Sequence, residues 1–222
     1  MFFYSIASFG QEVEDYTFDY CDIYTLKNKS SEAVLKRYII GNSKDGSYFA
    51  YILTTPTDTI LDMALNDQRN VRHYQFNVQR KHIKEISSFA ELTQDYKLFK
   101  ASVSNKNDKN YVYDFQNLTA NNEKVLEVKV FKNESRNKLV AKYHYYLEDN
   151  KLFTNQFQTS RLLLSREIPT SKTNNEGVLL KQVAFEVKSD TALETNELNE
   201  INPLDLNIKL KTAPSLTLRE KN

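Results

Sequence analysis

The stretch Lys124–Phe153 reads KVLEVKVFK (124–132), NESRN (133–137) and KLVAKYHYYLEDNKLF (138–153). In its first arm, one phase carries Leu126, Val128 and Val130, and the other carries Glu127, Lys129 and Phe131. In its second arm, one phase carries Leu139, Ala141, Tyr143, Tyr145 and Leu147, and the other carries Val140, Lys142, His144 and Tyr146. A period of two residues is typical of β-strands. Two such arms around a short polar break predict a β-hairpin.

Similar apolar or alternating segments occur along most of the chain. They cover residues 16–28, 30–42, 47–55, 59–67, 70–78, 111–118, 178–190 and 204–210. Short polar links between consecutive strands favour antiparallel neighbours. Residues 79–100 instead place Ile83, Ile86, Phe89 and Ala90 at steps of three and four, which indicates a short helix. We therefore expect a mainly β fold of about nine to eleven strands. It forms a single curved antiparallel sheet, a half-barrel or open barrel, with one or two short helices.

The chain is expected to form one domain. Its 222 residues suit a single large β domain. Residues 1–10 are apolar and precede an acidic stretch, so they resemble a signal-peptide remnant cleaved before Gln11. The alternative is that FFYSIASF forms a buried first strand. We expect a β-rich domain at 11–211, an acidic linker at 191–203 before a short last strand, and a loose tail at 212–222. Later in the chain no apolar run reaches the length of a membrane-spanning helix.

Charge and composition argue against several functions. Thirty Lys and Arg and twenty-nine Asp and Glu are interspersed, whereas nucleic-acid binding needs a positive surface. Only four glycines occur, and no Gly-rich phosphate loop is among them. The one cysteine, Cys21, stands between acidic residues and is expected to be a buried free thiol. We expect no nucleic-acid partner and no cofactor.

No combination of residues points firmly to catalysis or to a metal. His73 and His82, with Glu85 or Asp95, are one possible ligand set. Neighbouring Arg and Lys side chains oppose a bound cation, so surface histidines are the preferred interpretation. The acidic pairs of the chain are Asp19 with Asp22 and Asp58 with Asp62. Paired carboxylates leave a glycan-acting hydrolase open as an alternative. We predict neither a catalytic nor a metal-binding residue.

The aromatic residues give the strongest hint of function, because they recur at period two. Tyr16, Phe18, Tyr20 and Tyr24 share one phase of the first strand. We expect this phase to face inward with aromatic residues of later strands, while Lys142 and His144 face outward. The predicted ligand-binding residues are Tyr20, Tyr24, Tyr111, Tyr113, Phe115, Tyr143 and Tyr145. They would line an apolar cavity, and a solid Tyr/Phe core is the alternative.

With this layout and an export-like start, the chain resembles the exported lipoprotein-carrier type of half-barrel periplasmic protein from Gram-negative bacteria. The resemblance rests on the general arrangement of strands and on the Tyr, Lys and Asn content, and no residue role is transferred through it. It implies a curved sheet, a helical lid over its concave side and transient binding of acyl chains.

These expectations combine into one functional hypothesis with two alternatives. The hypothesis is an exported protein, periplasmic or associated with the envelope, that carries or senses a hydrophobic or lipid-like ligand without catalysis. The first alternative is an envelope protein-interaction or structural module of the β-sandwich type, with an envelope protein as partner. The second is the glycan-acting hydrolase.

Overall fold

A computed structural model describes residues 13–70, 72–78, 81–83, 85–93, 96–99, 111–120, 123–149 and 177–211. The predicted export segment, the tail and residues 150–176 lie outside these ranges. The described strands form one antiparallel sheet of eleven strands in the order β6-β5-β4-β3-β2-β1-β11-β10-β9-β8-β7. The prediction of a single open antiparallel sheet is confirmed, and the β-sandwich arrangement is wrong.

The elements follow the sequence pattern closely. The strands are β1 (Val13–Asn28), β2 (Ser31–Gly41), β3 (Tyr48–Thr54), β4 (Ile60–Asp67), β5 (Arg72–Phe76), β6 (Tyr96–Phe99), β7 (Val112–Ala120), β8 (Glu123–Phe131), β9 (Leu139–Glu148), β10 (Val178–Phe185) and β11 (Ala192–Lys211). The 3-10 helix η1 (Ile86–Ser88) and the helix α1 (Phe89–Leu92) occupy the segment where the periodicity changes. The expected hairpin is confirmed, since β8 pairs with β9 in antiparallel register.

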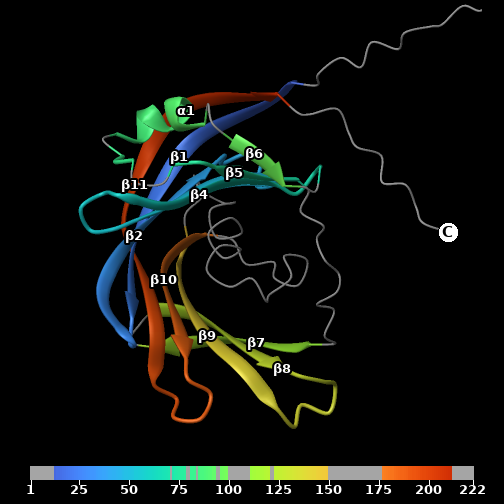
Figure 1. Ribbon diagram of the computed structural model, residues 1–222. Helices are drawn as coiled ribbons and strands as arrows, with labels where there is room; N and C mark the ends of the chain where they lie inside the picture. Colours follow the sequence, from blue (N-terminus) through green and yellow to red (C-terminus); the bar gives the residue numbers. More distant parts are fainter. Residues whose placement is uncertain are drawn as a thin grey trace, which may run out of the picture.

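Figure 1 shows a strongly curved sheet with an upper part, β3–β6 and the helices, and a lower part, β7–β10. The strands β1, β2 and β11 join the two parts. β11 is a single strand of 20 residues, so the expected acidic linker before a short last strand is wrong. Its acidic half pairs with both β1 and β10, and most of its glutamates lie at exposed positions. A strand with one solvated face tolerates this composition.

The register assigns side chains to the two faces of the sheet. One continuous row is Cys21, Ile40, Ala50, Leu65 and Tyr74. We call its side the helix face, because this row belongs to the same buried cluster as Phe89 and Leu92 of the helix α1. The next row is Asp22, Ile39, Tyr51, Ala64 and Gln75. Neighbouring rows point to opposite sides, and we call this second side the concave face.

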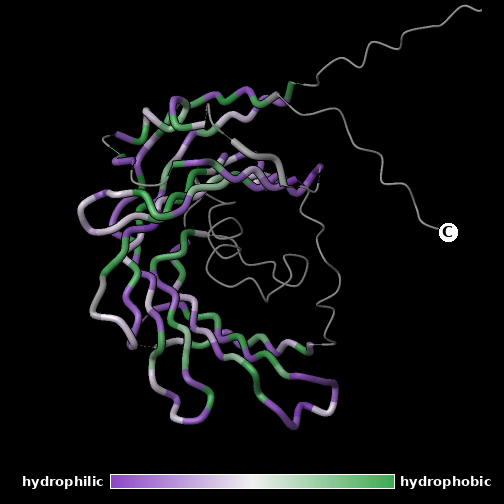
Figure 2. The backbone as a smooth tube through the Cα atoms, viewed as in Figure 1, coloured by the Kyte–Doolittle hydropathy of each residue, from purple (hydrophilic) through white to green (hydrophobic). Residues whose placement is uncertain are grey.

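The same register carries the concave face into the lower part of the sheet. Leu26, two alternations after Asp22 on β1, stands in a row with Asn196, Gln182, Tyr145 and Leu126. Tyr145 and Leu126 belong to a second apolar cluster, with Val128, Leu147 and Leu179. The two apolar clusters therefore lie on opposite faces of one sheet. Along β7–β9, Figure 2 shows the alternation of hydrophobic and hydrophilic residues that this arrangement requires.

Part-way along β1, the side chains of one alternating phase change from one face of the sheet to the other. Tyr16 and Phe18 belong to the cluster on the helix face, and so does Cys21. The register against β11 shifts between Phe18 and Tyr20, as at a β-bulge, which breaks the alternation of side chains. Tyr20 and Tyr24 are thereby on the concave face, paired with Gly41 and Arg37. The expectation that Tyr16, Phe18, Tyr20 and Tyr24 share one inward phase is wrong.

The upper cluster is a closed core. Phe18 and Phe89 are fully buried, and their ring centroids are 6.4 Å apart in an edge-to-face arrangement. Phe76 meets Phe89 at 6.2 Å. The helix therefore seals the helix face of the upper part. The helical lid over the concave side, which the family resemblance implied, does not occur among the residues that the structure describes.

Gly41 gives a first prediction, concerning stability. A Cβ atom at Gly41 would overlap the hydroxyl and ring of Tyr20, which is completely buried. Because the ring has little room to move, Gly41→Ala is expected to lower the free energy of unfolding by about 1–3 kcal/mol. Chemical denaturation would measure this, with Lys44→Ala in the nearby exposed turn as the control. Equal stability of the two variants would contradict the close approach.

Candidate ligand-binding face

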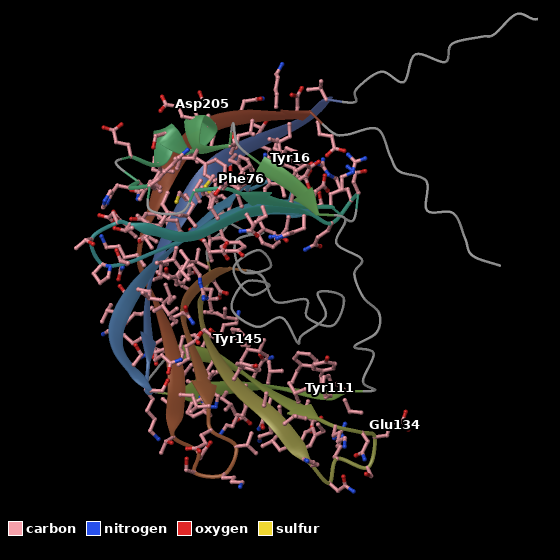
Figure 3. The ribbon with its side chains drawn as sticks, in the orientation of Figure 1. Tyr16, Phe76, Tyr111, Glu134, Tyr145 and Asp205 are labelled. Atoms are coloured by element: carbon pink, nitrogen blue, oxygen red, sulfur yellow. The ribbon has the colours of Figure 1, made fainter. Side chains whose placement is uncertain are left out.

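Aromatic side chains gather on the concave face of the lower part. Tyr113 and Phe115 from β7 stack with ring centroids 6.3 Å apart, and Tyr143 and Tyr145 from β9 lie 6.1 Å apart. Tyr145 is fully buried, whereas the other three are half-buried against the cluster below them. Figure 3 places Tyr145 on the side of β9 that faces the upper part of the sheet. The result is an apolar surface with half-buried rings over a buried aliphatic base.

The remaining predicted ligand residues have different surroundings. Tyr24 is fully buried, and its hydroxyl donates to the carbonyl oxygen of Leu179 at 2.7 Å. This bond ties β1 to β10 beneath the aromatic surface. Tyr20 is also fully buried and packs over Gly41 in the joining region. Tyr111 precedes β7 and is half-buried. The structure therefore brings Tyr113, Phe115, Tyr143 and Tyr145 together and leaves Tyr20 apart from them.

The opposite side of the same strands holds a charge cluster centred on Glu127. Its carboxylate lies 2.6 Å from Lys129 Nζ, 3.4 Å from Lys142 Nζ and 2.9 Å from His144 Nε2. Burial alone would raise the pKa of Glu127. Hydrogen bonds from Lys129 and His144 and the charge of Lys142 outweigh it, lowering the pKa from 4.5 to about 2. Lys142 and His144 do lie on the other face from Tyr143, but both are half-buried.

A hydrogen-bonded ladder of polar side chains crosses the concave face of the upper part. It runs from Tyr51 on β3 through Asp62 and Asn66 on β4 to His73 and Gln75 on β5. Tyr51 Oη donates to Asp62 Oδ2 at 2.7 Å, and Gln75 Nε2 donates to Asp62 Oδ1. His73 Nδ1 lies 2.7 Å from Oδ1 of Asn66, and His73 Nε2 lies 3.2 Å from Oε1 of Gln75. All five side chains are half-buried.

A buried polar link lies between the ladder and the aromatic surface. Gln182 and Asn196 are fully buried, and Asn196 Nδ2 donates to Gln182 Oε1 at 2.9 Å. Arg37 Nη1 donates to Asn196 Oδ1 at 3.1 Å. Since Gln182 stands directly opposite Tyr145, the concave face changes from apolar to polar within one strand spacing. Buried amides with satisfied hydrogen bonds fix this boundary.

A second titratable cluster closes the upper end of the helix face. Tyr16 Oη donates to Glu14 and to Asp67 Oδ2, the latter at 2.9 Å, and Arg69 stacks over the ring of Tyr48 at 4.5 Å. Burial would raise the pKa of Asp67, but hydrogen bonds from Arg69, Tyr16 and Asn70 lower it below its usual value. The cluster ties the start of β1 to the β4–β5 turn. It explains how a fully buried carboxylate is tolerated there.

The residues considered for metal binding or hydrolysis are dispersed. His73 belongs to the ladder, while His82 Nδ1 lies 3.4 Å from Thr59 Oγ1. Asp58 binds Lys36 and Tyr38, and the hydrogen bond from Lys36 lowers its pKa. Within the described ranges, no group of three or more His, Cys, Asp and Glu side chains could hold a metal ion.

Cys21 is a buried free thiol. Burial is the main cause that raises its pKa well above the ordinary value, with further contributions from Asp22 and Glu200. A raised pKa disfavours the nucleophilic thiolate. Asp95 lies outside the described residues.

Sequence reasoning missed the ladder, because its members come from three strands and meet only through the register. One signal was available: within NVRHYQF (70–76), the polar residues His73 and Gln75 alternate with Tyr74 and Phe76. Asp62 and Asn66 likewise share one phase of β4. The buried link through Gln182 and Asn196 left no comparable pattern.

Comparison with known proteins gives structural similarity only. No protein-family model and no curated protein matches the chain. The similar solved structures include MucB in complex with MucA(peri), at 8% identity and a TM-score of 0.38, with 84% of this chain and 50% of that chain aligned. The chain therefore spans about half the length of that MucB chain. A Pseudomonas aeruginosa MucA/MucB complex matches at 8% identity and a TM-score of 0.37, over 84% of this chain and 52% of that chain.

A LolA superfamily protein from Nitrosomonas europaea also resembles the chain, at 10% identity and a TM-score of 0.38, with 86% of this chain and 87% of that chain aligned. Across the described part of the chain, no helix combines the length and apolar character needed to cross a membrane.

Proposed function

We propose that this chain is an exported, non-enzymatic binding protein that carries or senses a hydrophobic, lipid-like ligand. The binding surface is the concave face of β7–β10, where the half-buried rings of Tyr113, Phe115 and Tyr143 pack against the apolar cluster that contains the buried Tyr145. Its location in the cell envelope stays a prediction from the sequence.

One observation carries the proposal: the aromatic rings sit on a separate apolar cluster, away from the main core. The upper cluster alone seals the helix face with Phe18, Phe76 and Phe89, so the rings of the lower concave face are not needed to close it. Rings that are half-buried retain apolar area that a ligand can remove from water. Burial of such area stabilises a complex by about 25 cal/mol per Å², and an aromatic lining with few polar groups is typical of sites for apolar ligands.

The surface predicts that Tyr143→Ser weakens ligand binding. Removing the ring is expected to raise the Kd for a fluorescent fatty acid, 11-(dansylamino)undecanoic acid, by about tenfold, because roughly 1.5 kcal/mol of apolar contact is lost. Fluorescence titration measures the Kd, and thermal unfolding checks that the variant is folded. Val140→Ser is the matched control, since Val140 belongs to the same strand but lies 40% exposed on the opposite face.

Two results would overturn the proposal. The first is a wild-type protein that neither binds the probe nor carries lipid in native mass spectrometry after purification from its own organism. The second is an unchanged Kd in a folded Tyr143→Ser variant.

Binding of an envelope protein is a second candidate, favoured by the strand β7. This strand ends the sheet order and pairs with β8 over nine positions without a register shift. It contains neither lysine nor proline, which are the residues that commonly prevent strand addition. A partner would extend the sheet there. A partner chain in native mass spectra, lost on Gln116→Pro, would support this candidate in place of the lipid carrier.

A further inference from the structure

We propose that the ligand is amphipathic and that its polar end is uncharged and rich in hydroxyl groups, as in a glycosyl or glycerol headgroup. That end binds the ladder formed by Tyr51, Asp62, Asn66, His73 and Gln75, while the apolar end lies on the aromatic surface. The inference rests on the proposed function, since it assigns the polar end of the same ligand to the upper half of the same face.

The strand register sets the positions of the ladder and the aromatic surface. Tyr51 and Gln75 share the concave row with Asp22, and Asp22 alternates on β1 with Leu26, whose row reaches Tyr145. The ladder and the aromatic rings therefore belong to one face of one sheet. Between β3 and β9 the sheet order has five steps, or about 24 Å along the curved surface at the usual strand spacing. A long-chain amphiphile spans a distance of this order.

The hydrogen bonds of the ladder meet at Asp62. Gln75 Nε2 donates to Asp62 and, at 3.1 Å, to the carbonyl oxygen of Met63, so Gln75 Oε1 is left to accept from His73 Nε2–H. His73 Nδ1 lies 2.7 Å from Oδ1 of Asn66, which holds the other edge of the ring. The hydrogen bonds from the side-chain NH₂ group of Gln75 and from the Tyr51 hydroxyl both end on Asp62.

The ladder has the chemistry to bind hydroxyl groups. Planar amides and a carboxylate present donors and acceptors side by side, and a hydroxyl group can both donate and accept. Adjacent hydroxyls can bind to neighbouring members of the ladder, with the ring of Tyr51 beside them. The polar side chains are already held by one another, so little conformational freedom is lost when a ligand binds.

The charge of the ladder disfavours an anionic ligand. Asp62 is the only member of the ladder with a fixed charge. A sulfate or phosphate headgroup would meet this carboxylate and be repelled. Lys97 stands opposite Gln75 in the register, on the strand β6 at the outer end of the row, three strands away from Tyr51 on β3. The guanidinium of Arg37 binds Asn196 within the buried link. The ladder therefore favours a neutral, hydroxyl-bearing group over an anion.

The test compares probes that share one alkyl chain and differ in the headgroup. Dodecyl maltoside, dodecyl sulfate and dodecyltrimethylammonium, each below its micelle concentration, compete with 11-(dansylamino)undecanoic acid for the full-length protein. We expect dodecyl maltoside to bind about tenfold more tightly than dodecyl sulfate, and more tightly than dodecyltrimethylammonium, whose quaternary nitrogen can neither donate nor accept a hydrogen bond. Gln75→Leu should abolish this preference while leaving dodecyl sulfate within about twofold of its wild-type Kd. Asn207→Leu, which also replaces an amide side chain with leucine but on the exposed part of β11, should leave the Kd of all three probes unchanged.

The outcomes separate this inference from the proposed function. Equal binding of all three probes, or tightest binding of either charged probe, would overturn the inference and leave a hydrophobic carrier standing. Failure of every probe, including the fluorescent one, would overturn both. If Gln75→Leu does not fold, Asp62→Asn replaces it: it keeps the shape, removes the charge, and should reduce the discrimination against dodecyl sulfate. An unchanged discrimination in that variant would also contradict the inference.

Discussion

A lysine in place of Tyr145 is expected to destabilise the protein more than any change on the neighbouring surface, by about 3–5 kcal/mol. Tyr145 is fully buried at the centre of the lower cluster, between Leu126 on β8 and Gln182 on β10. The variant loses the packing of the ring and places an ammonium group among apolar side chains. Urea denaturation followed by circular dichroism would report the free energy of unfolding.

The adjacent residue provides the control. Tyr146 points to the opposite face, half-buried, where Lys181 Nζ lies 5.6 Å from the centre of its ring. Tyr146→Lys loses this cation–π contact and is expected to cost only about 1 kcal/mol. Equal free energies of unfolding for the two variants would contradict the assignment of the two faces. A lower free energy of unfolding for Tyr146→Lys than for Tyr145→Lys would mean that the two faces are inverted.

The β8–β9 hairpin could be predicted because its alternation reports local geometry. The polar positions Glu127 and His144 and the apolar positions Leu126 and Tyr145 form separate cross-strand pairs, as period two requires. The same reasoning failed on β1. There, the shift after Phe18 arises from pairing with β11, about 190 residues later in the chain. A bulge of this kind leaves no mark in the alternation of β1 itself.

The aromatic half of the candidate site could be predicted from the sequence, whereas its polar half could not. The rings of Tyr113, Phe115 and Tyr143 could be placed together from their spacing, since each strand shows its own aromatic phase. The contrast between an aromatic lower part and a polar upper part could not be predicted, because it depends on which rows the register aligns. Only the full strand order puts the ladder around Asp62 on the same face as Tyr145.

Removing the charge of Glu127 is the other change with a large expected effect. This carboxylate is the shared partner of Lys129, Lys142 and His144, and Lys129 stands directly opposite Lys142 in the register. Glu127→Gln keeps the shape but leaves Lys129 and Lys142 to repel one another. At pH 7 the variant is expected to be less stable than the wild type by up to about 3 kcal/mol, the free energy that corresponds to lowering the pKa from 4.5 to about 2.

The pH dependence of this difference follows from the direction of the shift. Because the pKa of Glu127 is lower in the folded than in the unfolded chain, its contribution is fully present above about pH 4.5 and is lost as the pH falls toward 2. The two proteins should therefore converge in stability at pH 2 and differ most near neutrality, as denaturation series at several pH values would show. Lys36→Met, which removes a cation from the separate pair with Asp58, is the control for general charge effects. A stability difference between wild type and Glu127→Gln that did not change between pH 7 and pH 2 would mean that Glu127 contributes through its hydrogen bonds, and not through its charge.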